Sequence, residues 1–516
     1  MSVNSVQIPL LLLGLSAQSQ SKQIPGDFVR VPSPSETKSL SDQVNALIKD
    51  ESRQFALIAR PGVILDKALK DATQELINDL NRDYPNWGVC GATGARWDGQ
   101  RTYWYLRRPP MNPEAGVGGR PVVTVGSEVL LLNLKQLRAE ECLIQEPTAN
   151  WWEIGPLLSL ECLRRSLCVL VDPRLMVVDA GSEPEQRATD AIKNLVRRFF
   201  LNHRVHLPWG TMEVADVAYR EFLSLPAVSH DKLDIVACYD AAMARARQAR
   251  PVTLTIACRA QFNRQYLLER AMLSFAAAQQ EAPAGCEVRV ALVSDVSPDT
   301  LQLEVTRLRS RFPSLSLSGL HVTSRSRETS RVDHLLSSIA QIDSDYVWFV
   351  DDDDFVMPGA VPALARVFVP HAPLLLVGSS EVLEESWTDS RLVDFNPCGA
   401  HASKHVFDVF QGENFVPICG MVIPVKLARE RCAHVEASGE YLEDYFILMR
   451  LLTSPRVEVE VLGAQIAGIS LRGQENTVRQ SDRDTWNRSY AQFVGELMRS
   501  ADSSNPLLWQ LVRNSQ

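Results

Sequence analysis

Two acidic groups in the second half of the sequence are the residues best suited to chemistry. Four aspartates, Asp351 to Asp354, follow directly after the apolar run YVWFV at residues 346–350. Like charges about 4 Å apart repel by roughly 1 kcal/mol in water and by about 4 kcal/mol at an effective dielectric constant near 20. A divalent ion such as Mg²⁺ or Mn²⁺ would relieve this repulsion, and both favour carboxylates combined with substrate phosphates. The alternative is a solvated acidic loop, but the position after a buried strand favours a metal site.

The second acidic group is Glu443-Asp444, at the start of a helix expected over residues 442–452. Carboxylates in a first helical turn are favoured by the helix dipole by about 0.3–1 kcal/mol, so capping alone is one explanation. Catalysis is the other, because a carboxylate at the start of a buried helix can accept a proton from a hydroxyl. The presence of the aspartate run favours catalysis.

Strands and helices that alternate from residue 251 onward must position these groups. This alternation indicates βα units and a largely parallel sheet, in which ligands bind beyond the carboxyl ends of the strands. Residues 379–414 are expected to form variable loops that set specificity. Strands are expected at residues 252–257, 288–294, 320–323, 346–350, 374–377, 415–423 and 457–462.

Length and composition limit the class of protein. The 516 residues suffice for two large domains or three modest ones, and 45% hydrophobic with 22% charged residues is ordinary globular usage. The net charge of −9 argues against nonspecific binding to nucleic acid or to an anionic bilayer. The 10 cysteines lack zinc-site spacing. Five of them lie among apolar neighbours and are expected to be buried thiols in a reducing cytoplasm: Cys90, Cys162, Cys168, Cys258 and Cys419. No apolar run approaches about 18 residues, so we expect no transmembrane segment and a cytoplasmic protein, at most peripheral at the inner face of the membrane.

Three motifs make residues 251–481 resemble a family 2 glycosyltransferase with the GT-A fold, a Rossmann-like α/β fold for nucleotide-diphospho-sugars. The motifs, in the order found in that family, are VTLTIACRAQFNR, VWFVDDDDFVMPGA and YLEDY. The resemblance implies an Mn²⁺ or Mg²⁺ cofactor and a role for each matching residue. The metal ligands would be Asp351 and Asp353, the catalytic residues Asp444 (the general base) and Glu443, and the donor-binding residues Arg259, Asn263, Asp295, Asp352 and Arg472.

The reaction implied by the resemblance is a single inverting displacement at the anomeric carbon of a nucleotide-sugar. A UDP-sugar is the favoured donor, and a glycan or lipid-linked glycan of surface polysaccharide biosynthesis is the expected acceptor. Two alternatives stay open: a nucleotidyltransferase, which also places acidic pairs at strand ends, and a non-catalytic glycan-binding scaffold.

The first half of the chain resembles a degenerate copy of the same domain. A helix with Val44, Leu47 and Ile48 on one face precedes a strand at residues 55–59, but this strand ends in Arg-Pro-Gly rather than in aspartates. Gly155-Pro156 is expected to open a helix in the position that Glu443-Asp444 holds in the second half. We therefore expect an inactive α/β domain over residues 1–222, a connecting helix over 223–250 and a catalytic domain over 251–516 with a helical extension at its end. Acceptor binding or formation of a homodimer is the role envisaged for the first domain, and an unrelated α/β domain is the alternative.

Overall fold

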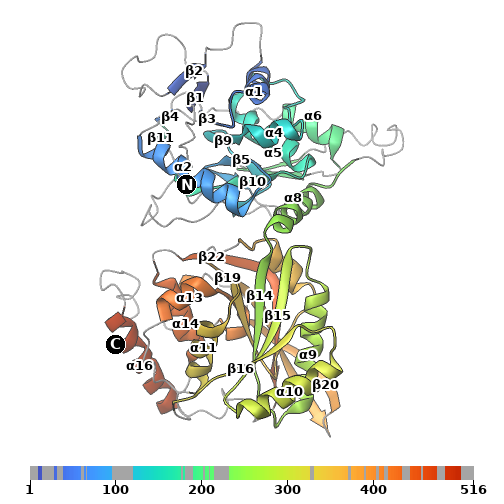
Figure 1. Cartoon of the computed structure of the whole chain (residues 1–516), viewed down its shortest axis with the longest axis vertical. Helices are drawn as coiled ribbons and strands as arrows, with labels where there is room; N and C mark the ends of the chain where they lie inside the picture. Colours follow the sequence, from blue (N-terminus) through green and yellow to red (C-terminus); the bar gives the residue numbers. More distant parts are fainter. Residues whose placement is uncertain are drawn as a thin grey trace. The chain divides into compact units, whose positions relative to one another are not determined.

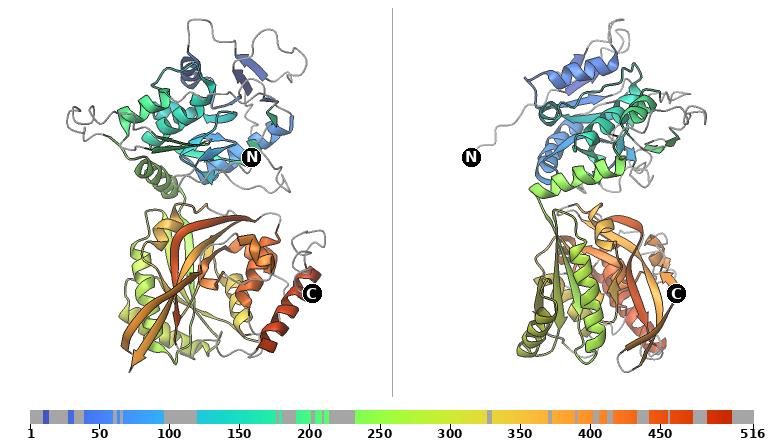
Figure 2. Two further views of the ribbon diagram at one scale, coloured as in Figure 1. Left: turned by 180° about the vertical axis from the view of Figure 1, so that it is seen from behind. Right: turned by 90° about the vertical axis from the view of Figure 1, so that its right-hand side faces the viewer.

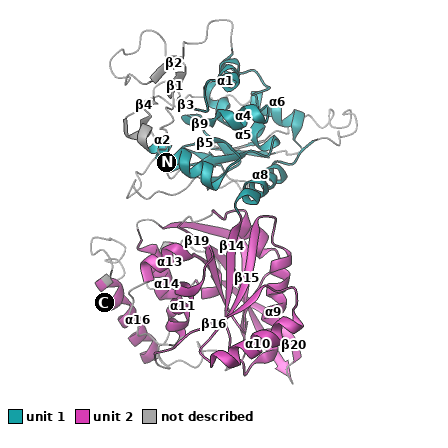
Figure 3. Ribbon diagram, viewed as in Figure 1, with its two compact units in different colours: residues 1–250 teal, residues 251–516 magenta. Residues whose placement is uncertain are grey.

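The computed structural model describes most of the chain, in two compact units of residues Met1–Arg250 and Pro251–Gln516 (Figure 3). Each unit has its own mixed sheet with helices, so the predicted α/β class is confirmed. None of the helices in the described ranges combines the length and the apolar character needed to cross a bilayer. The described residues are 10–13, 28–31, 39–59, 63–64, 67–95, 120–175, 178–179, 190–200, 204–208, 210–213, 232–325, 330–369, 373–388, 391–401, 406–411, 416–432, 442–454, 457–472 and 483–500.

The second unit is built on a nine-stranded sheet. Its order is β16 (Leu317–His321), β15 (Cys286–Ser294), β14 (Val252–Arg259), β17 (Tyr346–Asp351), β21 (Met421–Pro424), β19 (Leu374–Thr388), β22 (Glu458–Leu471) and β18 (Phe355–Val356), with β20 (Arg391–His401) paired to β19. β14 lies between β15 and β17 and is parallel to both, so the carboxyl ends of these three strands lie at one edge. Arg259, the last residue of β14, is the ladder partner of Asp351, the last residue of β17.

Helices cover both faces of this sheet (Figures 1 and 2). Ser297 caps α10 (Pro298–Arg311) as expected, because its side chain accepts a hydrogen bond from the N–H of Thr300 and Pro298 follows as the first helical residue. α9 (Gln265–Gln280) and α10 (Pro298–Arg311) lie on one face, while α11 (Ser330–Gln341), α13 (Val425–Cys432), α14 (Glu443–Leu452) and α16 (Arg483–Ser500) lie on the other, and α12 (Ala360–Ala365) follows β18.

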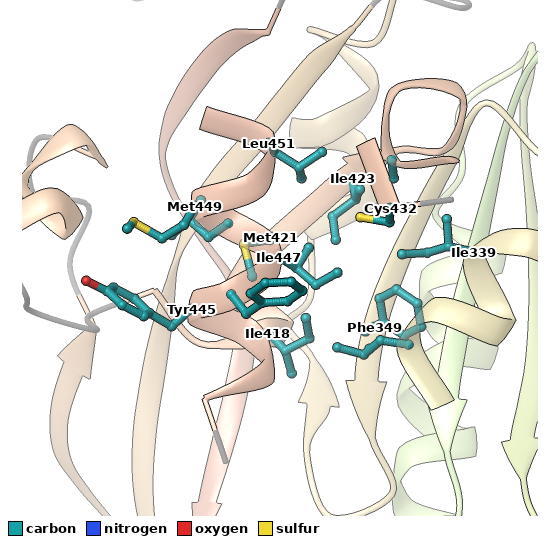
Figure 4. Close-up of a cluster of buried hydrophobic side chains, with 14 of the residues drawn as sticks. Ile339, Phe349, Ile418, Met421, Ile423, Cys432, Tyr445, Ile447, Met449 and Leu451 are labelled. Carbon is teal, nitrogen blue, oxygen red and sulfur yellow. The ribbon is translucent and has the colours of Figure 1, made fainter. Parts of the chain in front are cut away.

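A hydrophobic core between the sheet and α14 holds that helix against the sheet. Ile447 of α14 belongs to the same buried cluster as Phe349 of β17 and Ile423 of β21 (Figure 4). Phe446 stacks on Phe493 of α16, with 4.6 Å between the ring centroids. Each fully buried side chain of this size stabilises the fold by about 1.5–3 kcal/mol, so the first turn of α14 is held firmly relative to β17.

The segment expected to form loops at residues 379–414 instead contains a long antiparallel hairpin of β19 and β20. All 11 residues of β20 are exposed, so neither of its faces is buried against a core. A strand without a buried face shows no alternation of apolar and polar residues, which is why the sequence pattern missed it. β22 likewise extends to Leu471, well beyond the predicted end of its strand. In the segment predicted as a strand over 415–423, a short 3₁₀ turn (Ile418–Gly420) precedes β21.

The first unit has a seven-stranded sheet in the order β2 (Phe28–Val31), β1 (Leu10–Leu13), β3 (Phe55–Ala59), β9 (Val129–Asn133), β5 (Trp87–Gly91), β10 (Cys168–Val171) and β7 (Arg120–Pro121). In this sheet β1 is parallel to both β2 and β3, β9 is antiparallel to both β3 and β5, and β10 is parallel to β5. The second unit repeats these directions: β14 is parallel to both β15 and β17, β21 is antiparallel to both β17 and β19, and β22 is parallel to β19. Three two-stranded pairs accompany the sheet: β4 (Val63–Ile64) with β11 (Val178–Asp179), β6 (Gly94–Ala95) with β8 (Thr124–Val125), and β12 (Arg204–Leu207) with β13 (Gly210–Glu213).

The segment expected to form a connecting helix contains α8 (Ile235–Ala249), which packs within the first unit: the carbonyl of Ala242 accepts hydrogen bonds from Asn86 at 2.9 Å and from Cys168 at 3.4 Å. One prediction about a helix in this unit is wrong. Gly155 does not open a helix but lies inside α5 (Trp151–Arg164), and a Cβ at this position would come within 2.6 Å of the backbone oxygen of Val125. The Arg-Pro-Gly segment at residues 60–62 lies outside the described residues. The helices among the described residues of this unit are α1 (Leu40–Lys49), α2 (Lys67–Asp83), α4 (Leu134–Ala139), α5 (Trp151–Arg164), α6 (Asp190–Phe199) and α8 (Ile235–Ala249).

Candidate active site

Arg259 joins the two acidic motifs of the second unit. Its Nε and Nη2 donate hydrogen bonds to the two oxygens of Asp351 at 2.6 and 2.7 Å, and its Nη1 donates to Oε1 of Glu443 at 2.8 Å. Because Arg259 and Asp351 are ladder partners at the ends of parallel strands, their side chains meet at the same edge of the sheet. The Arg259 side chain is only 8% exposed, so these bonds form largely away from water.

Glu443 and Asp444, the first two residues of α14, follow a strained backbone position. Leu442, which caps the helix, has a φ of 68°, in the left-handed region that a branched residue rarely adopts. Strain of this kind clusters at functional sites, where the surrounding packing must maintain it. Asp444 is half-buried, and its Oδ1 accepts a hydrogen bond from the N–H of Tyr445 at 2.7 Å.

Glu443 is held as an anion. Its Oε1 also accepts a hydrogen bond from Nε of Arg331 at 2.7 Å, in addition to the bond from Arg259. Burial by itself would raise the pKa of Glu443, but the charges of Arg331 and Arg259 outweigh it and lower the pKa to about 2. A carboxylate this acidic is a weak base near neutral pH, so the geometry favours a positioning role for Glu443 and leaves Asp444 as the candidate base.

Asp353 and Asp354 lie at the turn that follows β17. Oδ2 of Asp353 accepts hydrogen bonds from Arg264 at 2.9 Å and from Arg472 at 2.5 Å. Oδ1 of Asp354 accepts one from the backbone N–H of Ser470 at 3.2 Å. Burial, reinforced by the charges of Asp353 and Asp351, raises the pKa of Asp354 well above its ordinary value.

Asp352 holds the loop after β14 and is not part of the group that could bind an ion. Its two oxygens accept hydrogen bonds from Nη2 of Arg264 and from the backbone N–H of Gln261, each at 2.6 Å. Burial raises the pKa of Asp352 to about 7, although the charge of Arg264 opposes that rise. Its contacts therefore join the turn after β17 to the loop after β14.

The residues at this edge fit a hard divalent cation. One carboxylate oxygen from each of Asp351, Asp353 and Asp354 can be chosen so that all three lie within 4.8 Å of one another. Oxygen ligands suit Mg²⁺ and Mn²⁺, and such an ion would reduce the repulsion among three neighbouring carboxylates. The sequence predicted Asp351 and Asp353 as ligands, and Asp354 is the third member of the group.

Two further residues named from the sequence lie near the surface. Asp295 follows β15 at the same sheet edge and is 46% exposed; its Oδ2 accepts a hydrogen bond from Ser324 at 3.0 Å and lies 3.5 Å from Nε2 of His334. Burial lowers the pKa of His334, and Asp295 opposes that shift. Asn263 is exposed in the turn between β14 and α9.

Three residues that contact the aspartate run or its surroundings were not predicted from the sequence: Arg264, Arg270 and Glu385. Arg264 follows Asn263 directly, and its position in the loop after the first strand is a signal that could have nominated it. Arg270 and Glu385 form an ion pair between residues 115 positions apart. No local pattern marks such a pair, because it depends on how α9 packs beside β19.

Comparison with known proteins shows which family part of the second unit matches. Residues 261–415, which include the aspartate run, match the family model described as glycosyl transferase family 2. Among solved structures, TarS residues 1–349 from S. aureus in complex with UDP-GlcNAc is 16% identical, with a TM-score of 0.35 over 51% of this chain and 71% of that chain. A mannosyltransferase from Pyrobaculum calidifontis in complex with GDP-Man and Mn²⁺ is 13% identical, with a TM-score of 0.31 over 51% of this chain and 70% of that chain. A search of curated proteins found no match. Residues 261–415 of the second unit thus match the family that the three motifs of the sequence resemble, glycosyl transferase family 2.

Proposed function

We propose that the second unit transfers a sugar from a nucleotide-sugar donor to an acceptor hydroxyl with inversion at the anomeric carbon. The observation that supports this proposal is the side chain of Arg259, which contacts both Asp351 and Glu443 and so links the end of β17 to the first turn of α14, where Asp444 follows Glu443. UDP-sugars are the first donors to test. The acceptor class, a glycan or lipid-linked glycan of surface polysaccharide biosynthesis, rests on the family resemblance alone.

Asp444 is the proposed general base. It takes the proton of the acceptor hydroxyl while that oxygen forms a bond to the anomeric carbon, from the face opposite the diphosphate. The bond between the anomeric carbon and the diphosphate oxygen breaks at the same time, and its electron pair leaves with the nucleoside diphosphate. One base suffices for this displacement, and positioned general bases typically contribute about 10²–10⁴-fold in rate.

The proposed metal ligands are Asp351, Asp353 and Asp354, and the proposed ion is Mn²⁺ or Mg²⁺. When bound, the ion would stabilise negative charge on the departing diphosphate. Arg264 and Arg472 both contact Asp353, so they are the cations best placed to bind phosphate oxygens of the donor. Asp295, with nearly half of its side chain exposed, is the proposed contact for the nucleobase.

The test is product analysis with the full-length chain. UDP-, GDP- and dTDP-sugars are incubated with Mn²⁺ and candidate acceptor glycans, and the released phosphate species are identified. Free nucleoside diphosphate together with a glycosylated acceptor supports the proposal. Release of pyrophosphate would identify a nucleotidyltransferase, and glycan binding with no released nucleotide from any donor would favour the non-catalytic scaffold.

We further propose that the first unit is a non-catalytic copy of the same fold. The support is the shared series of strand directions, together with the order of the helices. In the first unit α1 precedes β3, α4 follows β9 and α5 precedes β10. In the second unit α11 likewise precedes β17, α13 follows β21 and α14 precedes β22. Where α14 begins with two carboxylates, α5 begins with the buried pair Trp151 and Trp152.

A double variant, Asp353→Asn with Asp444→Asn, tests the inactivity of the first unit in the full-length chain. Turnover of nucleotide-sugar should vanish in this variant, because both proposed catalytic elements belong to the second unit. Turnover that survives would place an active site elsewhere and contradict the proposal.

A further inference from the structure

We propose that Arg270 and Glu385 form a positioning pair that holds the aspartate run in place and controls the rate of transfer without touching the substrate. This inference rests on the proposed function of the second unit. It concerns residues that neither the acidic motifs nor the family resemblance points to.

Arg270 of α9 contacts the aspartate run through its backbone. Its Nη2 donates a hydrogen bond to the carbonyl oxygen of Asp353, and its Nη1 pairs with Oε1 of Glu385. The guanidinium also lies over two aromatic rings, 5.1 Å from the centroid of Phe355 and 5.5 Å from that of Trp387. These contacts restrict the guanidinium to one orientation, in which it bridges α9, β19 and the turn after β17.

Glu385 is a buried carboxylate with partners on both oxygens. Its side chain is 2% exposed. Oε2 accepts hydrogen bonds from the hydroxyl of Ser470 and from Nε1 of Trp387, the latter at 2.9 Å, while Oε1 pairs with Arg270. Burying an ion pair gives little net stability compared with apolar packing, so stability alone does not account for a charge at this position.

Ser470 of β22 extends the network to the next aspartate. Its hydroxyl donates to Glu385, and its backbone N–H donates to Oδ1 of Asp354 at 3.2 Å. The neighbouring Phe355 pairs with Gly468 of β22, where a Cβ would come within 2.2 Å of the phenyl ring, so the ring lies directly on the strand.

The network therefore contacts three successive residues of the turn after β17. It binds the carbonyl oxygen of Asp353, the carboxylate of Asp354 and the ring of Phe355. None of these contacts involves the carboxylate of Asp353, which stays directed to Arg264 and Arg472. An arrangement of this kind orients ligand carboxylates, and the loss of such outer partners typically costs about 10–100-fold in metal affinity or activity.

The experiment measures transfer by the full-length chain with four changes: Arg270→Met, Glu385→Gln, their combination, and Arg270→Lys. Each of the first two should lower kcat by about 10–100-fold and weaken Mn²⁺ binding in calorimetry, with a much smaller change in the KM of the acceptor. The combined variant should be about as impaired as either single one, because both remove the same interaction. Arg270→Lys should recover part of the rate, since a lysine keeps the charge but cannot bridge both acceptors in the same way.

The matched control is Arg307→Met, which breaks pairs with Glu269 and Glu304 on the surface of α9 and α10 and should leave kcat unchanged. Circular dichroism reports whether each variant folds. If Arg270→Met does not fold, Trp387→Phe serves instead, because it removes one hydrogen bond to Glu385 and keeps an aromatic ring beside Arg270; it should lower kcat by a smaller factor.

Folded variants with wild-type kcat and wild-type Mn²⁺ affinity would overturn the inference and leave the proposed function standing. Fully additive effects of Arg270→Met and Glu385→Gln would overturn it as well, because the two residues would then act independently. A wild-type chain that transfers no sugar would contradict the proposed function, and this inference with it.

Discussion

Asp351 and Glu443, which lie far apart in the sequence, share one guanidinium group, that of Arg259. Both oxygens of Asp351 and one oxygen of Glu443 accept hydrogen bonds from it, at 2.6 to 2.8 Å. The contact links the end of β17 to the first turn of α14 and so joins the two acidic motifs mechanically as well as electrostatically.

Replacing Arg259 with methionine should destabilise the second unit. The change leaves the buried carboxylate of Glu443 with Arg331 as its remaining cation, and it removes both hydrogen bonds from Arg259 to Asp351. Breaking a buried ion pair typically costs about 3–5 kcal/mol. Urea unfolding of the full-length variant measures the loss. As a control, Arg289→Met removes an exposed pair with Glu287 and should change the free energy of unfolding by less than about 1 kcal/mol. Equal effects of the two substitutions would refute the prediction.

The pKa of Glu443 predicts how stability depends on pH. Its folded-state pKa of about 2 lies below the ordinary value of 4.5, so the ionised form stabilises the fold at pH values above about 4.5. This contribution should decline as the pH falls from 4.5 towards 2. The difference in unfolding free energy between the wild type and Glu443→Gln should therefore be largest near pH 7 and shrink in that acidic range. A difference that stays constant from pH 7 to pH 2.5 would show that the Glu443 charge contributes nothing.

Asp444→Asn should separate catalysis from binding. Removal of the proposed base should lower the rate of transfer by about 10²–10⁴-fold while nucleotide binding, followed by calorimetry, stays close to that of the wild type. The change is nearly isosteric at a half-buried position, so the fold should persist. A variant that retains the full transfer rate would exclude Asp444 as the base.

Neighbouring aspartates should differ in their effect on metal binding. Asp353→Asn removes a proposed ligand and should weaken Mn²⁺ binding by at least about tenfold, measured with UDP present. Asp352→Asn is the matched comparison, because Asp352 contacts Arg264 and the loop after β14 and lies outside the group that could bind an ion. We expect its effect on Mn²⁺ affinity to be clearly smaller. The opposite ranking would require Asp352 to be a ligand.

Gly468→Ala should disturb the turn after β17 through packing alone. A methyl group at this position would come within 2.2 Å of the Phe355 ring, which must then move. Overpacking of this kind typically costs about 1–3 kcal/mol, and a lower midpoint of thermal unfolding should report it. Gly463, where a Cβ would meet nothing within 4 Å, provides the control. If both substitutions have the same effect, the close contact with Phe355 is not the cause.

The local features of the site could be predicted because they depend on residues adjacent in the chain. The buried run of β17 followed by aspartates, the Ser297 cap of α10 and the carboxylates in the first turn of α14 all follow from neighbouring residues. Their order along the chain was sufficient to indicate the α/β class and the family.

The pairing of charges depended on the tertiary structure. Arg259 meets Asp351 only because β14 and β17 are parallel neighbours in one register, and it meets Glu443 only because the core places α14 against β17. The same packing makes Glu443 too acidic to be an effective base and brings Arg270 to Glu385. Residue types and local spacing therefore determined which chemical groups this chain carries. Burial and long-range strand register decided which of those groups share a hydrogen bond, because such contacts join residues that no short stretch of sequence contains.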